Sequence, residues 1–121
     1  MNLEQLFSQY KEQSIEGRYI TLDKIYPILE KLSTDNQLEI IGKSVLDIPI
    51  YKFQIGTGKI KILLWSQMHG NESTTTKALI DFLNLLNGGS DFANTLLKAF
   101  TFCVIPMLNP DGATLYTREN A

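Results

Sequence analysis

Two apolar runs with the character of β-strands, residues 60–65 and 100–107, constrain the fold of this chain more than any other feature. The first reads Ile-Lys-Ile-Leu-Leu-Trp and the second reads Phe-Thr-Phe-Cys-Val-Ile-Pro-Met. Nearly continuous apolar strands are typical of sheets that are covered on both faces. Between the runs, residues 73–86 carry apolar side chains at helical spacing, and residues 91–99 predict a second short helix. The sequence from residue 59 onward therefore predicts a β-α-β unit and an α/β fold.

The N-terminal part of the chain predicts shorter elements. Residues 2–14 and 21–32 have apolar side chains at helical spacing, and Pro27 predicts a kink or a later start of the second helix. Residues 38–45 and 48–55 alternate enough to predict two antiparallel strands. We therefore expect an N-terminal helical segment over residues 1–37 and an α/β unit over residues 38–121.

The size and charge of the chain exclude several classes of protein. A length of 121 residues is that of one ordinary domain, and the net charge of -2 gives no reason to expect nucleic acid or an anionic membrane as partner. No apolar run approaches the ~20 residues that span a bilayer. The start of the chain lacks the basic and apolar regions of a signal peptide, so we expect a cytoplasmic protein.

Polar loops follow both apolar runs, at the edge of the sheet where α/β proteins bind their ligands. Residues 67–72 read Gln-Met-His-Gly-Asn-Glu, and residues 109–112 read Asn-Pro-Asp-Gly. This coincidence is the first indication of a functional site.

His69 and Glu72 form a pair of potential metal ligands at the junction of strand and helix. His69 is the single histidine of the chain, and there is one cysteine, which excludes a cluster of thiolate ligands. Residues three apart on a first helical turn lie on the same side, and an imidazole with a carboxylate suits Zn²⁺. The alternative is a surface histidine beside a glutamate that complements the positive end of the helix.

The other polar residues have plain structural interpretations as well. Asp111 lies in a sequence that strongly favours a turn, and Arg118 would by default be a solvated surface charge. Cys103 lies within a strand and reads as an inert core residue.

Taken together, these residues resemble the zinc carboxypeptidases, the M14 metallopeptidases. His69-Gly70-Asn71-Glu72 is similar to the first zinc-ligand motif of that family, and Asn109-Pro110-Asp111-Gly112 matches the family's next loop letter for letter. Tyr116 to Asn120 resembles the stretch that carries an arginine. The matching motifs span residues 59–121, so we expect the preceding segment to be a lineage-specific addition.

The resemblance implies a fold and a set of roles. The fold would be a truncated three-layer α/β/α domain with a mixed sheet, of the phosphorylase/hydrolase-like zinc-peptidase type. His69 and Glu72 would bind one zinc ion, and Arg118 would stabilise the oxyanion that forms when a metal-activated water attacks a peptide carbonyl. Asn71, Asn109 and Asp111 would contact the substrate or support the metal ligands.

Two departures from the family pattern limit this implication. Position 71 is Asn, where the digestive-type enzymes carry an arginine near the metal. The family's Asn-Arg pair, its third zinc ligand (a histidine) and its catalytic glutamate would lie beyond Ala121. We therefore expect this chain to be an incomplete and inactive part of a longer hydrolase, with an exposed sheet edge through which it could form homo-oligomers.

Two alternatives remain open. The first is a zinc-dependent deacylase of small N-acyl amino acids, of the succinylglutamate desuccinylase or aspartoacylase type, which also uses His-Gly-Asn-Glu. The second is a non-enzymatic interaction domain with a vestigial metal site. The Asn-Pro-Asp-Gly loop favours the peptidase, whose substrate would be a peptide.

Overall fold

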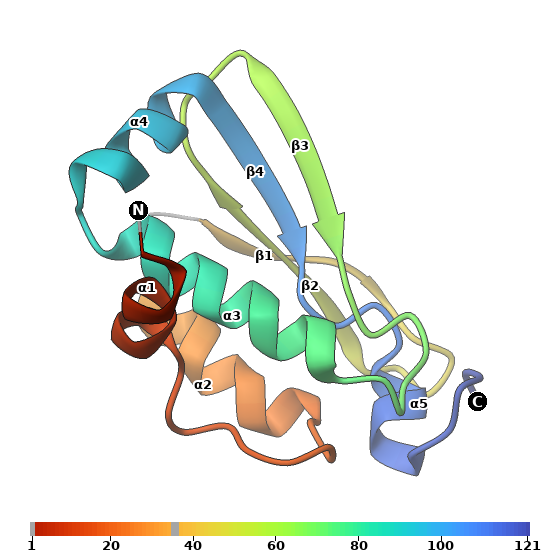
Figure 1. The fold of residues 1–121 in the computed structure, drawn as a ribbon. Coiled ribbons are helices and arrows are strands. Elements are labelled where there is room, and N and C mark those ends of the chain that lie inside the picture. Colours follow the sequence, from red (N-terminus) through yellow and green to blue (C-terminus); the bar gives the residue numbers. More distant parts are fainter. Residues whose placement is uncertain (1, 35–36) are drawn as a thin grey trace.

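A computed structural model describes residues 2–34 and 37–121 of the chain (Figure 1). In chain order the elements are α1 (Leu3–Tyr10), α2 (Leu22–Leu32), β1 (Leu38–Lys43), β2 (Pro49–Ile55), β3 (Ile60–Trp65), α3 (Thr74–Asn87), α4 (Asp91–Ala99), β4 (Phe100–Ile105) and α5 (Pro110–Leu115). The order of helices and strands predicted from the sequence is confirmed, apart from α5, which forms where a turn was expected.

The four strands form one mixed sheet in the order β1-β2-β4-β3. β1 and β2 are antiparallel, as predicted, and a bulge interrupts their register between Ile40 and Gly42. β3 and β4 are parallel, with Leu63 opposite Cys103, which confirms the β-α-β unit. The carboxyl ends of these two strands therefore lie next to each other at one edge of the sheet.

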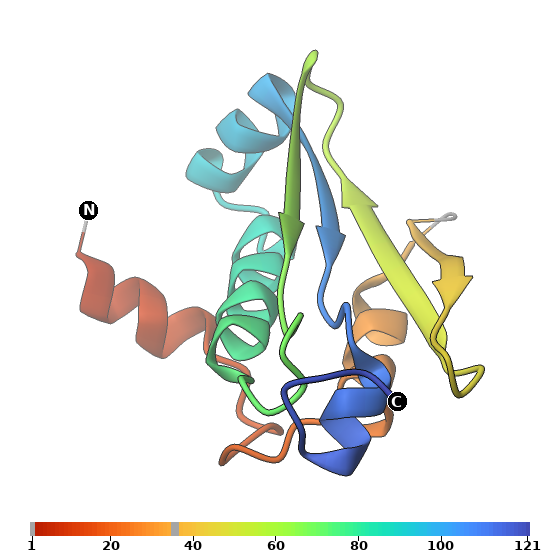
Figure 2. The ribbon, with the colours of Figure 1, turned by 90° about the vertical axis from the view of Figure 1, so that its right-hand side faces the viewer.

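The hydrophobic core lies on one face of the sheet. Phe53 of β2 and Val104 of β4 are fully buried there together with Leu29 of α2 and with Ile80 and Leu83 of α3. In the view of Figure 2, α3 lies beside β3 and β4. The fold class is α/β with a mixed sheet, as predicted, and the described residues form two of the three expected layers.

β3 differs from the prediction that it is covered on both faces. It is an edge strand of the sheet within the described residues, and Leu63 and Trp65 are 55% and 50% exposed on the face opposite the core. An apolar run indicates that a strand is suited to burial on both faces, but it does not supply the element that covers it.

The end of α1 and the place of Pro27 in α2 also differ in detail from the sequence pattern. α1 ends at Tyr10, four residues earlier than expected, and the Asn2 side chain caps its start by accepting from the amides of Glu4 and Gln5. α2 runs through Pro27, which is exposed. Because proline has no amide hydrogen to donate, the helix lacks one backbone hydrogen bond there but does not end. Within residues 2–34 and 37–121, no helix is long and apolar enough to cross a membrane.

Candidate metal and substrate site

The two polar loops predicted at the strand ends do meet. The backbone of Gly70, in the loop between β3 and α3, packs so closely on α5 that a Cβ at position 70 would lie 1.8 Å from the carbonyl carbon of Gly112. The amide of Asn71 donates to the carbonyl of Thr117 at 3.0 Å. Glycine is therefore required at position 70 because another backbone is in contact with it.

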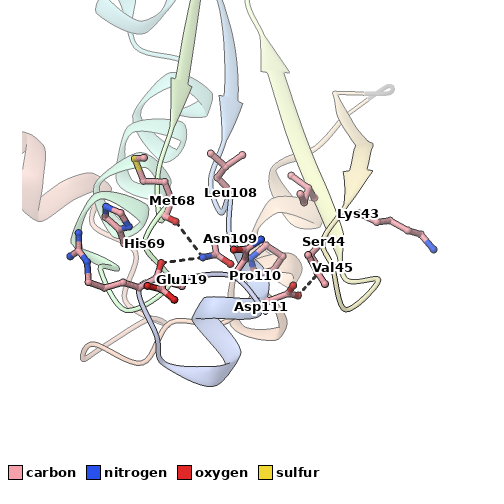
Figure 3. Close-up of a pocket in the computed structure, with 13 residues that line it drawn as sticks. Lys43, Ser44, Val45, Met68, His69, Leu108, Asn109, Pro110, Asp111 and Glu119 are labelled. Carbon is pink, nitrogen blue, oxygen red and sulfur yellow. Dashed lines mark hydrogen bonds between the residues drawn. The ribbon is translucent and has the colours of Figure 1, made fainter.

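Asn109 connects the two loops through its side chain. Its Nδ2 donates to the carbonyl oxygens of Met68 and Arg118, each at 3.3 Å, and its Oδ1 accepts from the amide of Gly112 at 2.8 Å (Figure 3). Asn109 is buried. The prediction that it contacts the substrate or supports the metal ligands stays a prediction.

His69 and Glu72 lie in the loop before α3 and not on its first turn, since the helix begins at Thr74. The amide of Glu72 donates to the carbonyl of His69 at 3.0 Å, which closes a turn between them. His69 is half-buried and the Glu72 side chain is exposed. The turn keeps the two predicted metal ligands on neighbouring positions of one loop.

Arg118 lies next to this loop. Its guanidinium donates to the carboxylate of Glu72, and the two side chains are 56% and 55% exposed. The structure thus brings together one predicted metal ligand and the predicted catalytic residue.

Asp111 faces a different partner. Its side chain is fully buried, and Oδ1 accepts a 2.5 Å hydrogen bond from the hydroxyl of Ser44 while Oδ2 accepts from the amide of Leu46 at 3.2 Å. Both donors belong to the turn that joins β1 to β2. Asp111 therefore fastens this hairpin to α5, a long-range contact with no signature in the local sequence.

Asn71 is half-buried, and its side-chain oxygen is the buried side-chain acceptor without a hydrogen-bond partner among the described residues. Since buried acceptors are nearly always satisfied, this oxygen is available to a donor that the described residues do not supply. A contact of Asn71 with a substrate, or support of a metal ligand, is compatible with this unpaired acceptor and stays a prediction.

A cavity of about 470 Å³ opens beside the two loops. His69, Arg118 and Asp111 contribute to its lining, and so do Lys43 and Ser44 at the end of the β1–β2 hairpin. Figure 3 shows His69 and Lys43 at opposite ends of this cavity. The hairpin was not expected to take part, because nothing in its sequence resembles a binding motif.

Sequence reasoning also missed a buried polar group beneath the loop that carries His69. The hydroxyls of Ser66 and Thr76 lie 2.9 Å apart, and Thr76 donates to Oε1 of Gln67 at 2.7 Å. The available signal was the run Thr74-Thr75-Thr76, which is unusual at the start of a helix.

The loop offers ligands of the types that bind zinc, but fewer of them than a catalytic zinc site has. An imidazole nitrogen and a carboxylate oxygen are ordinary zinc ligands, but a catalytic zinc site has three protein ligands. Among residues 2–34 and 37–121, no three His, Cys, Asp or Glu side chains are grouped so that they could hold a metal. His69 and Glu72 therefore suit two of the three positions.

Comparisons with known proteins identify relatives of this chain. The chain is 35% identical over 85 residues to gamma-D-glutamyl-L-diamino acid endopeptidase 1 of Lysinibacillus sphaericus, an alignment that covers 62% of this chain and 21% of the relative. It is 32% identical to cytosolic carboxypeptidase-like protein 5 of Danio rerio, over 81% of this chain and 9% of the relative. The chain thus spans less than a quarter of the length of either relative.

Solved structures show the same fold. A metallo-carboxypeptidase from Burkholderia cenocepacia superimposes with a TM-score of 0.73 at 22% identity, covering 82% of this chain and 30% of that one. Thrombin activatable fibrinolysis inhibitor superimposes with a TM-score of 0.74 at 21% identity, covering 98% of this chain and 36% of that one.

The sequence model of the zinc carboxypeptidase family, Peptidase M14, matches residues 25–121. The match begins well before residue 59, so the expectation that everything ahead of residue 59 is a lineage-specific addition is wrong. The physical reason is that Ile25 of α2 and Phe53 of β2 belong to the same hydrophobic core as α3 and β4. The division of the chain at residue 37 stays a prediction. With most of its length covered by this match, the chain belongs to the zinc carboxypeptidase family.

Proposed function

We propose that this chain forms part of a zinc-dependent peptidase in which His69 and Glu72 supply two of the metal ligands. The observation that carries the proposal is the meeting of the His69–Glu72 loop with Arg118 at the edge of one cavity. The third ligand must come from outside residues 2–34 and 37–121, since those residues contain no suitable group of three. The family's zinc would polarise a carbonyl and supply a nucleophilic water at neutral pH.

The residues of this chain have distinct parts in such a reaction. Arg118 would donate to the carbonyl oxygen of the substrate as negative charge develops on it, a role that its position beside the Glu72 carboxylate permits. Asn109 would hold the backbone of Arg118 and the backbone of Met68 at a fixed separation. Asp111 would keep the β1–β2 hairpin, which lines the far end of the cavity, attached to α5.

We infer that the substrate is a peptide, because the relatives named above are peptidases. An N-acyl amino acid stays the second candidate, on the observation that Asn71 stands where digestive-type enzymes have an arginine and that its side-chain oxygen has no hydrogen-bond partner among the described residues. A cytoplasmic location is part of the proposal and is supported by the names of the cytosolic carboxypeptidases among the relatives. We propose no nucleic acid or membrane partner.

Metal binding by the isolated chain tests the proposal directly. His69 is the single histidine, so its imidazole gives the only histidine signals in a nuclear magnetic resonance spectrum. Addition of Zn²⁺ should shift these signals at micromolar or higher metal, and Glu72→Gln should weaken the response. Glu119→Gln, which changes an exposed acid at the same cavity, is the matched control and should leave it unchanged.

Hydrolysis is measured in parallel with a peptide and an acyl amino acid. We expect no turnover by the 121-residue chain alone, and turnover of the peptide by the enzyme that contains the complete site. His69 signals that ignore Zn²⁺ would contradict the metal site, whereas nanomolar zinc affinity with turnover by the chain alone would contradict the need for a third ligand from elsewhere.

A further inference from the structure

Gln67 is a buried polar residue in a strained backbone conformation, two positions before His69. It is 3% exposed, and its φ of 48° lies in the left-handed region that residues other than glycine seldom adopt. Such strain persists where surrounding contacts enforce it, and it is concentrated near functional sites. The described structure shows which contacts enforce it here.

The Gln67 side-chain amide joins three segments of the chain. Nε2 donates to the carbonyl of Gly70 and to the carbonyl of Ile20, both at 2.8 Å, and Oε1 accepts from the hydroxyl of Thr76 at 2.7 Å. Both amide hydrogens and the amide oxygen are therefore used. Gly70 lies between the two predicted metal ligands, Ile20 lies ahead of α2, and Thr76 lies in the first turn of α3.

Residues 17–20, here called the strap, run along the base of the same loop. The hydroxyl of Ser73 donates to the carbonyl of Arg18 at 2.7 Å, and the ammonium of Lys77 donates to the carbonyl of Gly17 at 2.8 Å. The ring of Tyr19 packs against Tyr116, near Arg118, with 4.4 Å between centroids. The strap lies outside the family match, which begins at residue 25, and yet it contacts residues on both sides of the His69–Glu72 loop.

We propose that Gln67 is a positioning residue that fixes the His69–Glu72 loop against the strap and α3, and that it thereby sets the separation of the two metal ligands. This inference rests on the proposed function and adds to it a residue and a segment outside the family's motifs. The hydrogen bond to Gly70 acts within the loop itself, whereas the bond to Ile20 makes the N-terminal segment a part of the site's support.

The test replaces Gln67 by methionine, which keeps the volume of the side chain and removes all three hydrogen bonds. The readout is the pair of imidazole signals of His69 in the chain without metal, followed by a zinc titration. We expect one sharp set of signals in the natural chain, several or broadened sets in Q67M, and a loss of zinc affinity of about tenfold or more.

Thr101→Val is the matched control. Thr101 is buried and donates to the carbonyl of Gly58 at 2.7 Å, at the end of β4 remote from the loop. The Thr101→Val variant should have a lower midpoint of thermal unfolding and unchanged His69 signals. Thr76→Val, which removes the hydrogen bond to Oε1 of Gln67 and keeps the other two, should broaden the same signals to a smaller extent, and it serves as the test if Q67M does not fold.

The outcomes separate the two proposals. His69 signals that are unchanged in Q67M or, where that variant does not fold, in Thr76→Val would overturn the positioning role, whatever the change in stability. If the natural chain shows no response to zinc, the metal site is contradicted, while the spectra without metal still decide whether Gln67 orders the loop.

Discussion

The guanidinium of Arg118 donates to the carboxylate of Glu72 across 46 positions of sequence, and it joins the two loops at the edge of the cavity. In this arrangement Glu72, a predicted metal ligand, forms an ion pair with Arg118, the predicted catalytic residue. A metal ion that binds Oε1 of Glu72 competes with Arg118 for that oxygen.

Arg118→Gln is therefore expected to strengthen zinc binding by the isolated chain. Both side chains are more than half exposed, and exposed ion pairs contribute about 0.2–1 kcal/mol, so the gain should be no more than about fivefold. Calorimetric titration measures it, with Lys43→Gln at the other end of the cavity as control. In the complete enzyme the same variant should lower kcat by about 10²–10³. Weaker zinc binding in R118Q would show that the pair does not compete with the metal.

Asp111→Ala should destabilise the fold by about 1–3 kcal/mol, because the hydroxyl of Ser44 and the amide of Leu46 lose their acceptor in a partly buried setting. Ser44→Ala removes one of these bonds and should cost about 1 kcal/mol. Urea unfolding measures both, with Glu119→Ala as the exposed control. Equal stabilities for D111A and the natural chain would mean that the hairpin is held by other contacts.

Gly70→Ala should cost about 3 kcal/mol or more, since the added methyl would overlap the backbone of Gly112 and separate the two loops. Gly42→Ala is the control, because nothing lies within 4 Å of the corresponding position and its φ is ordinary. Thermal unfolding compares the two variants. A Gly70→Ala chain as stable as Gly42→Ala would show that the loops can move apart freely.

Asp81 on α3 gives an expectation for the effect of pH on stability. Burial raises its pKa above the ordinary value, and the charge of Glu12 adds to this, while a hydrogen bond from the Glu12 amide and the charges of Lys11 and Lys77 oppose it. Because the pKa of Asp81 is raised in the folded state, its contribution to the free energy of unfolding is present below the unfolded pKa. This contribution is lost as the pH rises through the folded pKa.

Asp81→Asn should consequently be more stable than the natural chain at neutral pH and should lose this advantage at acidic pH. The amide oxygen can still accept the 2.7 Å hydrogen bond from the amide of Glu12. Melting temperatures recorded from pH 3 to pH 7 test the expectation. An advantage that grows toward acidic pH would reverse the assigned direction.

The exposed apolar side chains of β3 predict self-association of the isolated chain. Leu63 and Trp65 lie on the uncovered face of an edge strand within the described part of the sheet. Leu63→Lys should shift the chain toward monomer in sedimentation velocity at high concentration. Leu115→Lys changes a leucine of nearly equal exposure, 54% against 55%, outside the sheet and should leave the distribution unchanged. A natural chain that stays monomeric throughout would refute this proposal.

The sequence was sufficient to predict most secondary structure and the meeting of the two loops, because strand and helix periods are local and parallel strands end at a common edge. It also predicted that His69, Glu72 and Arg118 would lie together, although this came from the resemblance and not from spacing. The family match and the common fold confirm the resemblance.

Other features depend on contacts between distant segments and could not be predicted. The bonds of Asp111 to the β1–β2 turn span more than 60 positions, and the contact of Gly70 with Gly112 spans 42. The burial of Gln67 likewise depends on Ile20, which lies 47 positions away. Local sequence patterns carry no information on such pairs. The sequence around Asp111 therefore predicted only a turn, and the backbone contact of Gly70 was not predicted.

Asn109 carries a consequence for the chemical durability of the protein. Asparagine side chains deamidate when the backbone nitrogen of the following residue attacks the side-chain carbonyl, and the nitrogen of Pro110 bears no hydrogen for that cyclisation. Conversion to aspartate would place a carboxylate oxygen against the carbonyls of Met68 and Arg118, where an amide now donates to both. The Asn-Pro order thus protects from deamidation a side chain that bonds to both loops, whereas Asn87, followed by Gly88 on the exposed end of α3, has no such protection.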